Sequence, residues 1–72
     1  MKQTDRLLEY MRSHVGITPL EALNELSIFR LAARISDLRS AGHRIQTIRK
    51  RVTNKQGEEC FVAEYRLEGE HE

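Results

Sequence analysis

The sequence predicts a small α+β domain of three helices followed by a C-terminal β-hairpin. Apolar residues recur at helical spacing as far as about residue 41, and the spacing becomes strand-like after Gly42. A polar segment with Asn and Gly at residues 53–58 then separates two strand-like runs. The 72 residues suffice for one domain. We expect this domain to span residues 1–67 and a disordered acidic tail to occupy residues 68–72.

The first helix is expected from Thr4 to about Ser13, with Thr4 as the N-cap and Gly16 as the breaker. Its apolar stripe comprises Leu7, Leu8, Met11 and Val15. The second helix is expected over residues 19–26, because Thr18, Pro19 and Glu21 form a capping box with proline at the first helical position. Its expected buried side comprises Leu20, Ala22, Leu23 and Leu26.

The third helix is expected over residues 28–41, with Ser27 as its N-cap and Gly42 just beyond its end. Its apolar stripe comprises Ile28, Leu31, Ile35 and Leu38. Because only a residue or two separates the second and third helices, the chain must turn sharply between them, as in a helix-turn-helix.

Two strands are expected, at residues 44–52 and 59–67, and Ile17 is a candidate for a short third strand. In the second strand, alternation places Phe61, Ala63, Tyr65 and Leu67 on one face. An isolated hairpin is unstable, so this one must pack on the helices. The predicted fold is therefore a three-helix winged helix-turn-helix with a C-terminal β-hairpin wing.

The charge distribution favours a polyanionic partner. Eight basic residues against one acidic residue give +7 over residues 30–57, whereas residues 1–29 sum to −1 and residues 58–72 to −5. The alternative is a solvated surface whose charge is neutralised by the acidic ends of the chain.

The start of the third helix holds the candidate DNA-reading residues, because the first residues of a recognition helix reach base edges in the major groove. The base-facing candidates are Phe29, Arg30, Ala33 and Arg34, and Ser27 is a candidate phosphate contact. Two alternatives stay open. Phe29 can instead fold back against the second helix, and the arginines can instead pair with Asp37.

The hairpin supplies the candidate contacts to the DNA backbone, which are Arg44, Arg49, Lys50, Arg51 and Lys55. Successive strand residues point to opposite faces, so these cations cannot all meet one surface. The alternative is a solvated strand edge that its charges protect from association.

Catalysis and metal binding find little support. The three histidines are far apart, and none has metal-ligand spacing with Cys60, which is expected to be a small, partly buried residue. We therefore expect no enzyme activity, no cofactor and no metal. A single cysteine, no apolar run of about 18 residues and a polar N-terminus favour the cytoplasm and no membrane partner.

Residues 18–23 (TPLEAL) and 28–43 (IFRLAARISDLRSAGH) resemble a family of small helix-turn-helix domains common in bacteriophage and prophage genomes. The likeness covers about residues 4–67, and Ser27 stands where such families often carry Gly. The resemblance implies a winged helix that binds double-stranded DNA and regulates transcription or excision in a bacterial host cell. A homodimer or side-by-side assembly on DNA is a further expectation. The runner-up hypothesis is a protein-interaction module.

Overall fold

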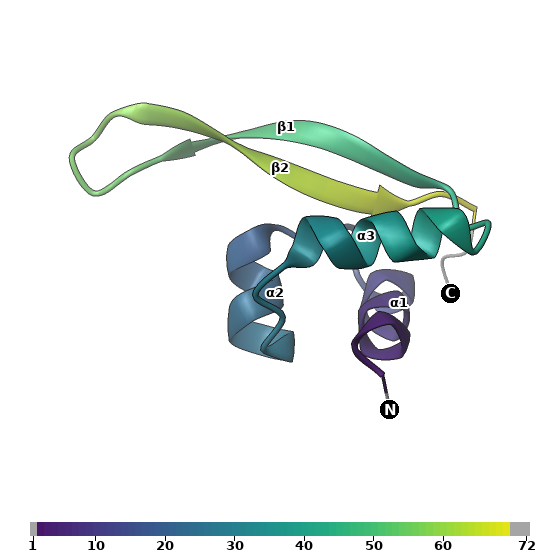
Figure 1. Cartoon of the computed structure of the whole chain (residues 1–72). Coiled ribbons are helices and arrows are strands. Elements are labelled where there is room, and N and C mark those ends of the chain that lie inside the picture. Colours follow the sequence, from purple (N-terminus) through teal and green to yellow (C-terminus); the bar gives the residue numbers. More distant parts are fainter. Residues whose placement is uncertain (1, 70–72) are drawn as a thin grey trace.

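The computed structural model describes residues 2–69 and has the predicted order of elements (Figure 1). The elements are α1 (Gln3–Ser13), α2 (Pro19–Leu26), α3 (Leu31–Ser40), β1 (Ile45–Thr53) and β2 (Glu59–Leu67). Of the expected acidic tail, residues 70–72 lie outside the described part of the chain. Within that part, no helix has the length and apolar character needed to cross a membrane.

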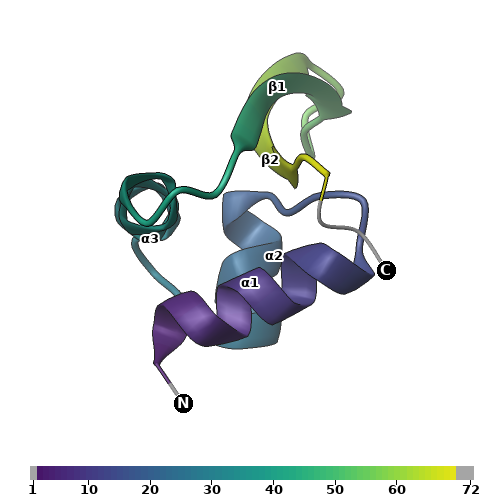
Figure 2. The same ribbon diagram turned by 90° about the vertical axis from the view of Figure 1, so that its right-hand side faces the viewer.

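The core lies where α1, α2 and α3 meet beneath the base of the hairpin (Figure 2). Its buried residues are Leu7, Met11, Ile17, Ala22, Ile28, Leu31, Ile35, Leu38, Ile45 and Leu67. The predicted stripe from Ile28 to Leu38 is buried throughout and is confirmed. Complete burial of side chains of this size is worth about 1.5–3 kcal/mol each, so this stripe fixes α3 on the body.

Three residues expected in the core are exposed instead. Val15 lies beyond the end of α1 and is therefore outside the apolar stripe. Leu20 is 65% exposed and Leu23 is 38% exposed, because they occupy the side of α2 that faces away from the core. Ala22 is fully buried, and the small α2 helix enters the core mainly through it and the half-buried Leu26.

The starts of α1 and α2 show why these helices begin where they do. The N-cap of α1 is Lys2 rather than Thr4, because the Asp5 carboxylate accepts a hydrogen bond of 3.4 Å from the Lys2 backbone N–H. The capping box of α2 is confirmed. Thr18 Oγ1 accepts from the Glu21 N–H at 3.3 Å, and Glu21 Oε1 accepts from the Thr18 N–H at 3.0 Å.

The turn between α2 and α3 differs from the prediction. Ser27 is the C-cap of α2 and has the left-handed conformation (φ 56°), so it is not the N-cap of α3. The Ser27 N–H donates back to Leu23, and the Ile28 N–H donates to Ala22 O at 3.1 Å. These bonds terminate α2. Residues 28–30 then form a non-helical link, and α3 begins at Leu31 with Arg30 as its N-cap.

Ser27→Gly should stabilise the fold. A left-handed backbone costs a non-glycine residue about 1–2 kcal/mol, part of which is offset by the greater freedom of glycine in the unfolded chain. We expect Tm to rise by a few °C, as about 1 kcal/mol would give in a domain of this size. Thermal unfolding followed by circular dichroism measures the change, with Ser40→Gly at the end of α3 as the matched control. An unchanged or lower Tm in Ser27→Gly would contradict the claim that the left-handed backbone of Ser27 is strained.

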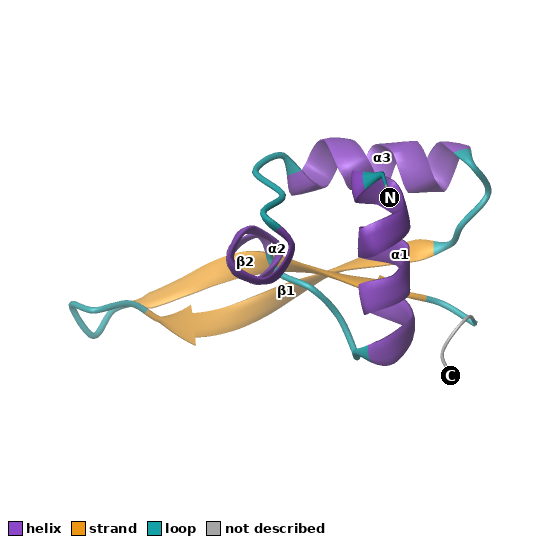
Figure 3. Ribbon diagram, turned by 90° about the horizontal axis from the view of Figure 1, so that it is seen from below, coloured by secondary structure: helices purple, strands orange, loops and turns teal. Residues whose placement is uncertain are grey.

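β1 and β2 pair antiparallel in a register that runs from Ile45 opposite Leu67 to Thr53 opposite Glu59. Ile17 exchanges two backbone hydrogen bonds of 2.9 Å with Tyr65. This contact is an isolated bridge beside a two-stranded sheet, so a single residue stands where a short third strand was expected. Asn54 Oδ1 closes the turn by accepting from the Gln56 and Glu58 N–H groups. The base of the hairpin covers the core, while its distal half projects past the helices (Figure 3).

Candidate nucleic-acid interface

The link before α3 presents an aromatic ring and a guanidinium group to solvent. Phe29 is 83% exposed, so the alternative in which it folds back against α2 is wrong. Arg30 is exposed as well, and its backbone forms the N-cap of α3.

Small side chains line the exposed side of α3. Ala32 and Ser36 are exposed, whereas Ala33 is half-buried. Arg34 is drawn toward α1, because its Nε lies 3.1 Å from Asp37 Oδ2 and its Nη1 donates to Gln3 Oε1 at 3.5 Å. The alternative that pairs Arg34 with Asp37 is therefore confirmed. Contact between Arg34 and a ligand would require it to leave both partners.

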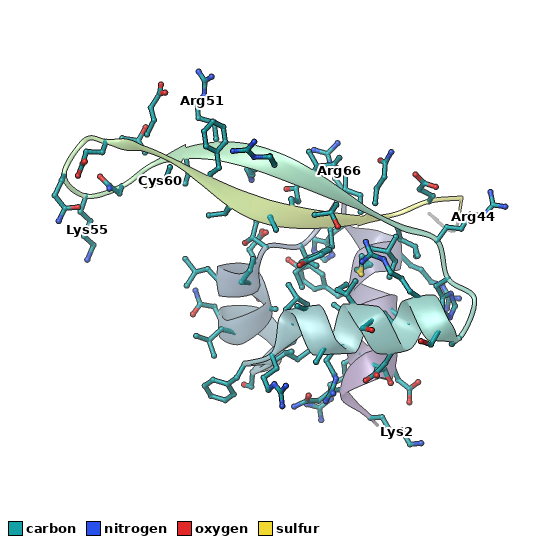
Figure 4. All side chains as sticks on the ribbon, turned by 45° about the horizontal axis from the view of Figure 1, so that its top comes forward. Lys2, Arg44, Arg51, Lys55, Cys60 and Arg66 are labelled. Carbon is teal, nitrogen blue, oxygen red and sulfur yellow. The ribbon has the colours of Figure 1, made fainter. Side chains whose placement is uncertain are left out.

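One face of the distal hairpin carries an aromatic residue between two arginines. Phe61 lies opposite Arg51 in the register and is 53% exposed. The Arg49 guanidinium carbon lies 4.5 Å from the centre of the Phe61 ring, and that of Arg51 lies 6.0 Å away. Arg51 also approaches Glu59 at 3.7 Å. Stacking on the ring orients both guanidinium groups, and the exposed Glu59 partly offsets the charge of Arg51. Arg51 points away from the helices (Figure 4).

The other face of the hairpin carries a buried carboxylate between two cations. Glu64 is buried, with Arg66 Nε at 2.7 Å and Lys50 Nζ at 3.5 Å. The hydrogen bond from Arg66 is the main reason why the pKa of Glu64 lies below its ordinary value, and Lys50 adds to the effect. The expectation that the basic hairpin residues divide between two faces is confirmed.

Gly16 allows this carboxylate to sit close to the loop between α1 and α2. A Cβ atom on Gly16 would lie 2.9 Å from Glu64 Cγ and 3.0 Å from Arg66 Cγ, which is closer than van der Waals contact permits. The glycine therefore lets the hairpin close on the loop at this point. Together with the neighbouring Ile17 bridge, this contact fixes the base of β2 on the helices.

Glu64→Gln should reduce the sensitivity of the fold to acid. Because the pKa of Glu64 is lowered in the folded protein, its stabilising contribution is present above the ordinary value of 4.5. That contribution is lost as the pH falls through the lower, folded pKa. Chemical denaturation from pH 7 to 2 should therefore show a smaller loss of unfolding free energy in the variant. Glu58→Gln in the exposed turn is the control. If the unfolding free energy of Glu64→Gln falls with pH in parallel with that of the parent protein, Glu64 does not have this role.

The remaining predicted backbone contacts lie at the two ends of β1. Lys55 is exposed in the turn, and Arg44 is exposed just before β1 (Figure 4). Ser27 is exposed between α2 and Phe29. The predicted residues therefore fall into two groups, one at the start of α3 and one along the hairpin.

Sequence reasoning missed Ala32 and Phe61 as candidate contacts and Arg39 as a structural residue. Alternation gave the face of Phe61, but its position opposite Arg51 depends on the register, which the long turn left open. Arg39 bonds to β1, and no short-range pattern reports such a contact. Ala32 is exposed and Ala33 is half-buried, a difference that the predicted apolar stripe does not specify.

The structure offers little for cofactor or metal chemistry. Within residues 2–69, no group of three or more His, Cys, Asp or Glu side chains is placed to hold a metal ion. Cys60 is half-buried, and its Sγ accepts a hydrogen bond of 3.4 Å from the Asn54 amide. A thiol in this position helps to hold the hairpin turn.

Three helices, a tight α2–α3 turn and a C-terminal two-stranded wing define a winged helix-turn-helix protein. The family model of the winged helix-turn-helix domain matches residues 2–70, and the chain belongs to this family. Searches of curated proteins and of solved structures returned no match. The family is typically non-enzymatic and DNA-binding.

Proposed function

We propose that the protein binds double-stranded DNA with the start of α3 in the major groove and the hairpin on the phosphate backbone. One observation carries the proposal. The exposed Phe29–Arg30 link and the tip of the basic hairpin lie toward the same end of the molecule (Figure 1). A duplex placed at this end can meet both groups at once.

The chemistry of the α3 group suits base edges. Arg30 can donate two hydrogen bonds to guanine O6 and N7, and Phe29 can contact thymine methyl groups. Ala32 and Ser36 are small, so they allow the helix to approach the floor of the groove. Arg34 and Ala33 are secondary candidates, because Arg34 is engaged by Asp37 and Ala33 is half-buried.

The hairpin group suits phosphates. Arg49 and Arg51 share one face, and Lys55 lies at the tip, so these three cations are favoured over Lys50, which lies on the other face and shares Glu64 with Arg66. Arg44 and Ser27 are further candidates for phosphate contacts. Such contacts supply affinity and salt dependence but no sequence information.

Regulation is the biological role that we propose, in the cytoplasm of a bacterial host and as a phage or prophage regulator of transcription or excision. The support is the likeness of residues 18–23 and 28–43 to such domains. Because a single domain of this size makes few base contacts, we propose action as a homodimer or a side-by-side assembly on DNA.

Fluorescence anisotropy with a labelled pool of random duplexes tests the DNA proposal. We expect binding at low salt and a steep loss of affinity as salt rises. Arg6→Ala is the charge-matched control, because Arg6 is an exposed arginine of α1 that belongs to neither group. The absence of binding at low salt would refute the proposal.

Protein docking is the second candidate function. An apolar hollow of about 520 Å³ lies between the start of α2 and the hairpin, and it is lined in part by Pro19, Leu20, Val52 and Val62. Capture from nuclease-treated host lysate tests this role. A partner that survives nuclease and is lost in both Leu20→Asp and Phe29→Ala, together with no affinity for duplex DNA, would favour docking.

A further inference from the structure

Arg39 connects the last turn of α3 to the start of β1. Its Nη2 donates to Ile45 O at 2.8 Å and lies 2.9 Å from Thr47 Oγ1, and its Nε donates to Ile45 O at 3.2 Å. One guanidinium group thus forms hydrogen bonds with both the backbone and a side chain of β1. The planar fork of arginine suits such a multiple contact.

The Ile45 carbonyl needs this partner because it lies on the free edge of β1. Tyr65 uses its N–H and C=O groups for Ile17, so the Thr47–Tyr65 pair exchanges no backbone hydrogen bonds. Hydrogen-bonded and non-hydrogen-bonded pairs alternate along an antiparallel ladder, so the Ile45–Leu67 pair, two residues away, is also non-hydrogen-bonded. The N–H and C=O groups of Ile45 and Thr47 therefore point away from β2. Ile45 is buried and its bonds to Arg39 are partly buried, and a carbonyl removed from water needs a hydrogen-bond partner.

Backbone contact between α3 and the hairpin is sparse, although Ile35 and Leu38 of α3 share the core with Ile45 and Leu67 of the hairpin. The backbone of α3 approaches mainly α1, whereas that of the hairpin approaches α1 and α2 through β2. The chain from α3 to β1 passes through Gly42, which has φ 101° and ends the helix. The hairpin is attached to the helices mainly through β2, and Arg39 adds a direct polar link from α3 to β1.

We propose that Arg39 is a positioning residue that sets the angle between α3 and the hairpin. By holding the base of β1, it fixes where the distal Arg49–Phe61–Arg51 face lies relative to the start of α3. The consequence for DNA binding rests on the proposed function, but the consequence for the free protein does not. Without Arg39, the hairpin samples a wider range of angles about its base.

Distance measurement between two spin labels on the DNA-free protein tests the positioning role. The labels are placed by Ser36→Cys on α3 and Gln56→Cys in the turn, in a Cys60→Ser background. We expect Arg39→Ala to broaden the distance distribution by about twofold or more. Arg39→Lys should restore little of the narrow width of the parent protein, because an ammonium group makes only a point contact. Arg44→Ala removes a neighbouring exposed arginine and should leave the distribution narrow.

Thr47→Val provides the milder variant, since it removes one acceptor and keeps the Ile45 bonds. It should broaden the distribution less than Arg39→Ala and remain folded even where Arg39→Ala does not. Narrow distributions in both Arg39→Lys and Thr47→Val, equal to that of the parent protein, would overturn the inference.

A DNA footprint separates positioning from direct contact. If Arg39 positions the hairpin, Arg39→Ala should lose the protection that the hairpin gives and keep the protection that α3 gives, and Arg39→Lys should behave similarly. Full recovery in Arg39→Lys would show a role as a simple cation and would overturn the inference. If the parent protein leaves no footprint, the proposed function fails, while the spin-label result still decides the role of Arg39.

Discussion

Arg30→Ala should weaken binding to a preferred duplex by about 1–3 kcal/mol, or roughly 5- to 150-fold. Arg30 is exposed and stands at the start of α3, so its removal takes away a bidentate base contact and leaves the core unchanged. The loss should be concentrated at one base pair, because direct readout acts on the base that is contacted. Anisotropy with the preferred duplex and with duplexes changed at each position measures both effects.

The lysine variant distinguishes base reading from charge. Arg30→Lys keeps the positive charge but loses the bidentate hydrogen-bond geometry of the guanidinium group. The preference for the preferred duplex over changed duplexes should therefore fall more than the affinity for random DNA. Arg6→Ala, with the same change in net charge, should retain the preference. An equal loss on every duplex in Arg30→Ala would place Arg30 on the phosphate backbone instead.

The double variant Arg49→Ala with Arg51→Ala should weaken binding to all duplexes alike. Each phosphate contact contributes about 0.9 to the slope of log affinity against log salt, so the slope should become shallower by roughly 2. Titrations at several salt concentrations measure it. The two residues are exposed, and their contacts to Phe61 and Glu59 lie at the surface, so the fold should persist.

Two further variants of the hairpin test which face meets the DNA. Lys50→Ala removes a cation on the other face, 3.5 Å from Glu64, so the slope should change less than in the arginine pair. Phe61→Leu keeps an apolar side chain but removes the aromatic face on which Arg49 and Arg51 rest, so affinity should fall while the charge is unchanged. A larger change in slope for Lys50→Ala than for the arginine pair would reverse the assignment of the faces.

Local patterns predicted most of the fold because each element carries its own signal. The stripe from Ile28 to Leu38 and the capping box at Thr18 depend on neighbours three or four residues apart, and the structure contains both. The hairpin strands and the Ile17 bridge also follow from local sequence. The same periodicity failed in α2, because Leu20 and Leu23 are buried only if another element covers them.

The candidate site was less predictable because its geometry depends on contacts between elements. The pairing of Arg34 with Asp37 spans three residues, and the sequence already gave it as an alternative. The contact between Lys50 and Glu64 and the stacking of arginines on Phe61 depend on the strand register and on the twist of the hairpin. The left-handed conformation of Ser27 places residues 28–30 in a link outside α3, so Phe29 and Arg30 are exposed but precede the helix.

An NMR titration of the ¹⁵N-labelled protein with duplex DNA tests the central claim most directly. If the start of α3 and the hairpin bind together, the amide signals of residues 29–36 and 47–56 should shift at the same DNA concentration. Signals from the surface between α1 and α2, around Arg6 and Tyr10, should stay in place. Shifts confined to that surface or to the hollow beside Leu20, with none at Arg30 or Arg51, would contradict the account.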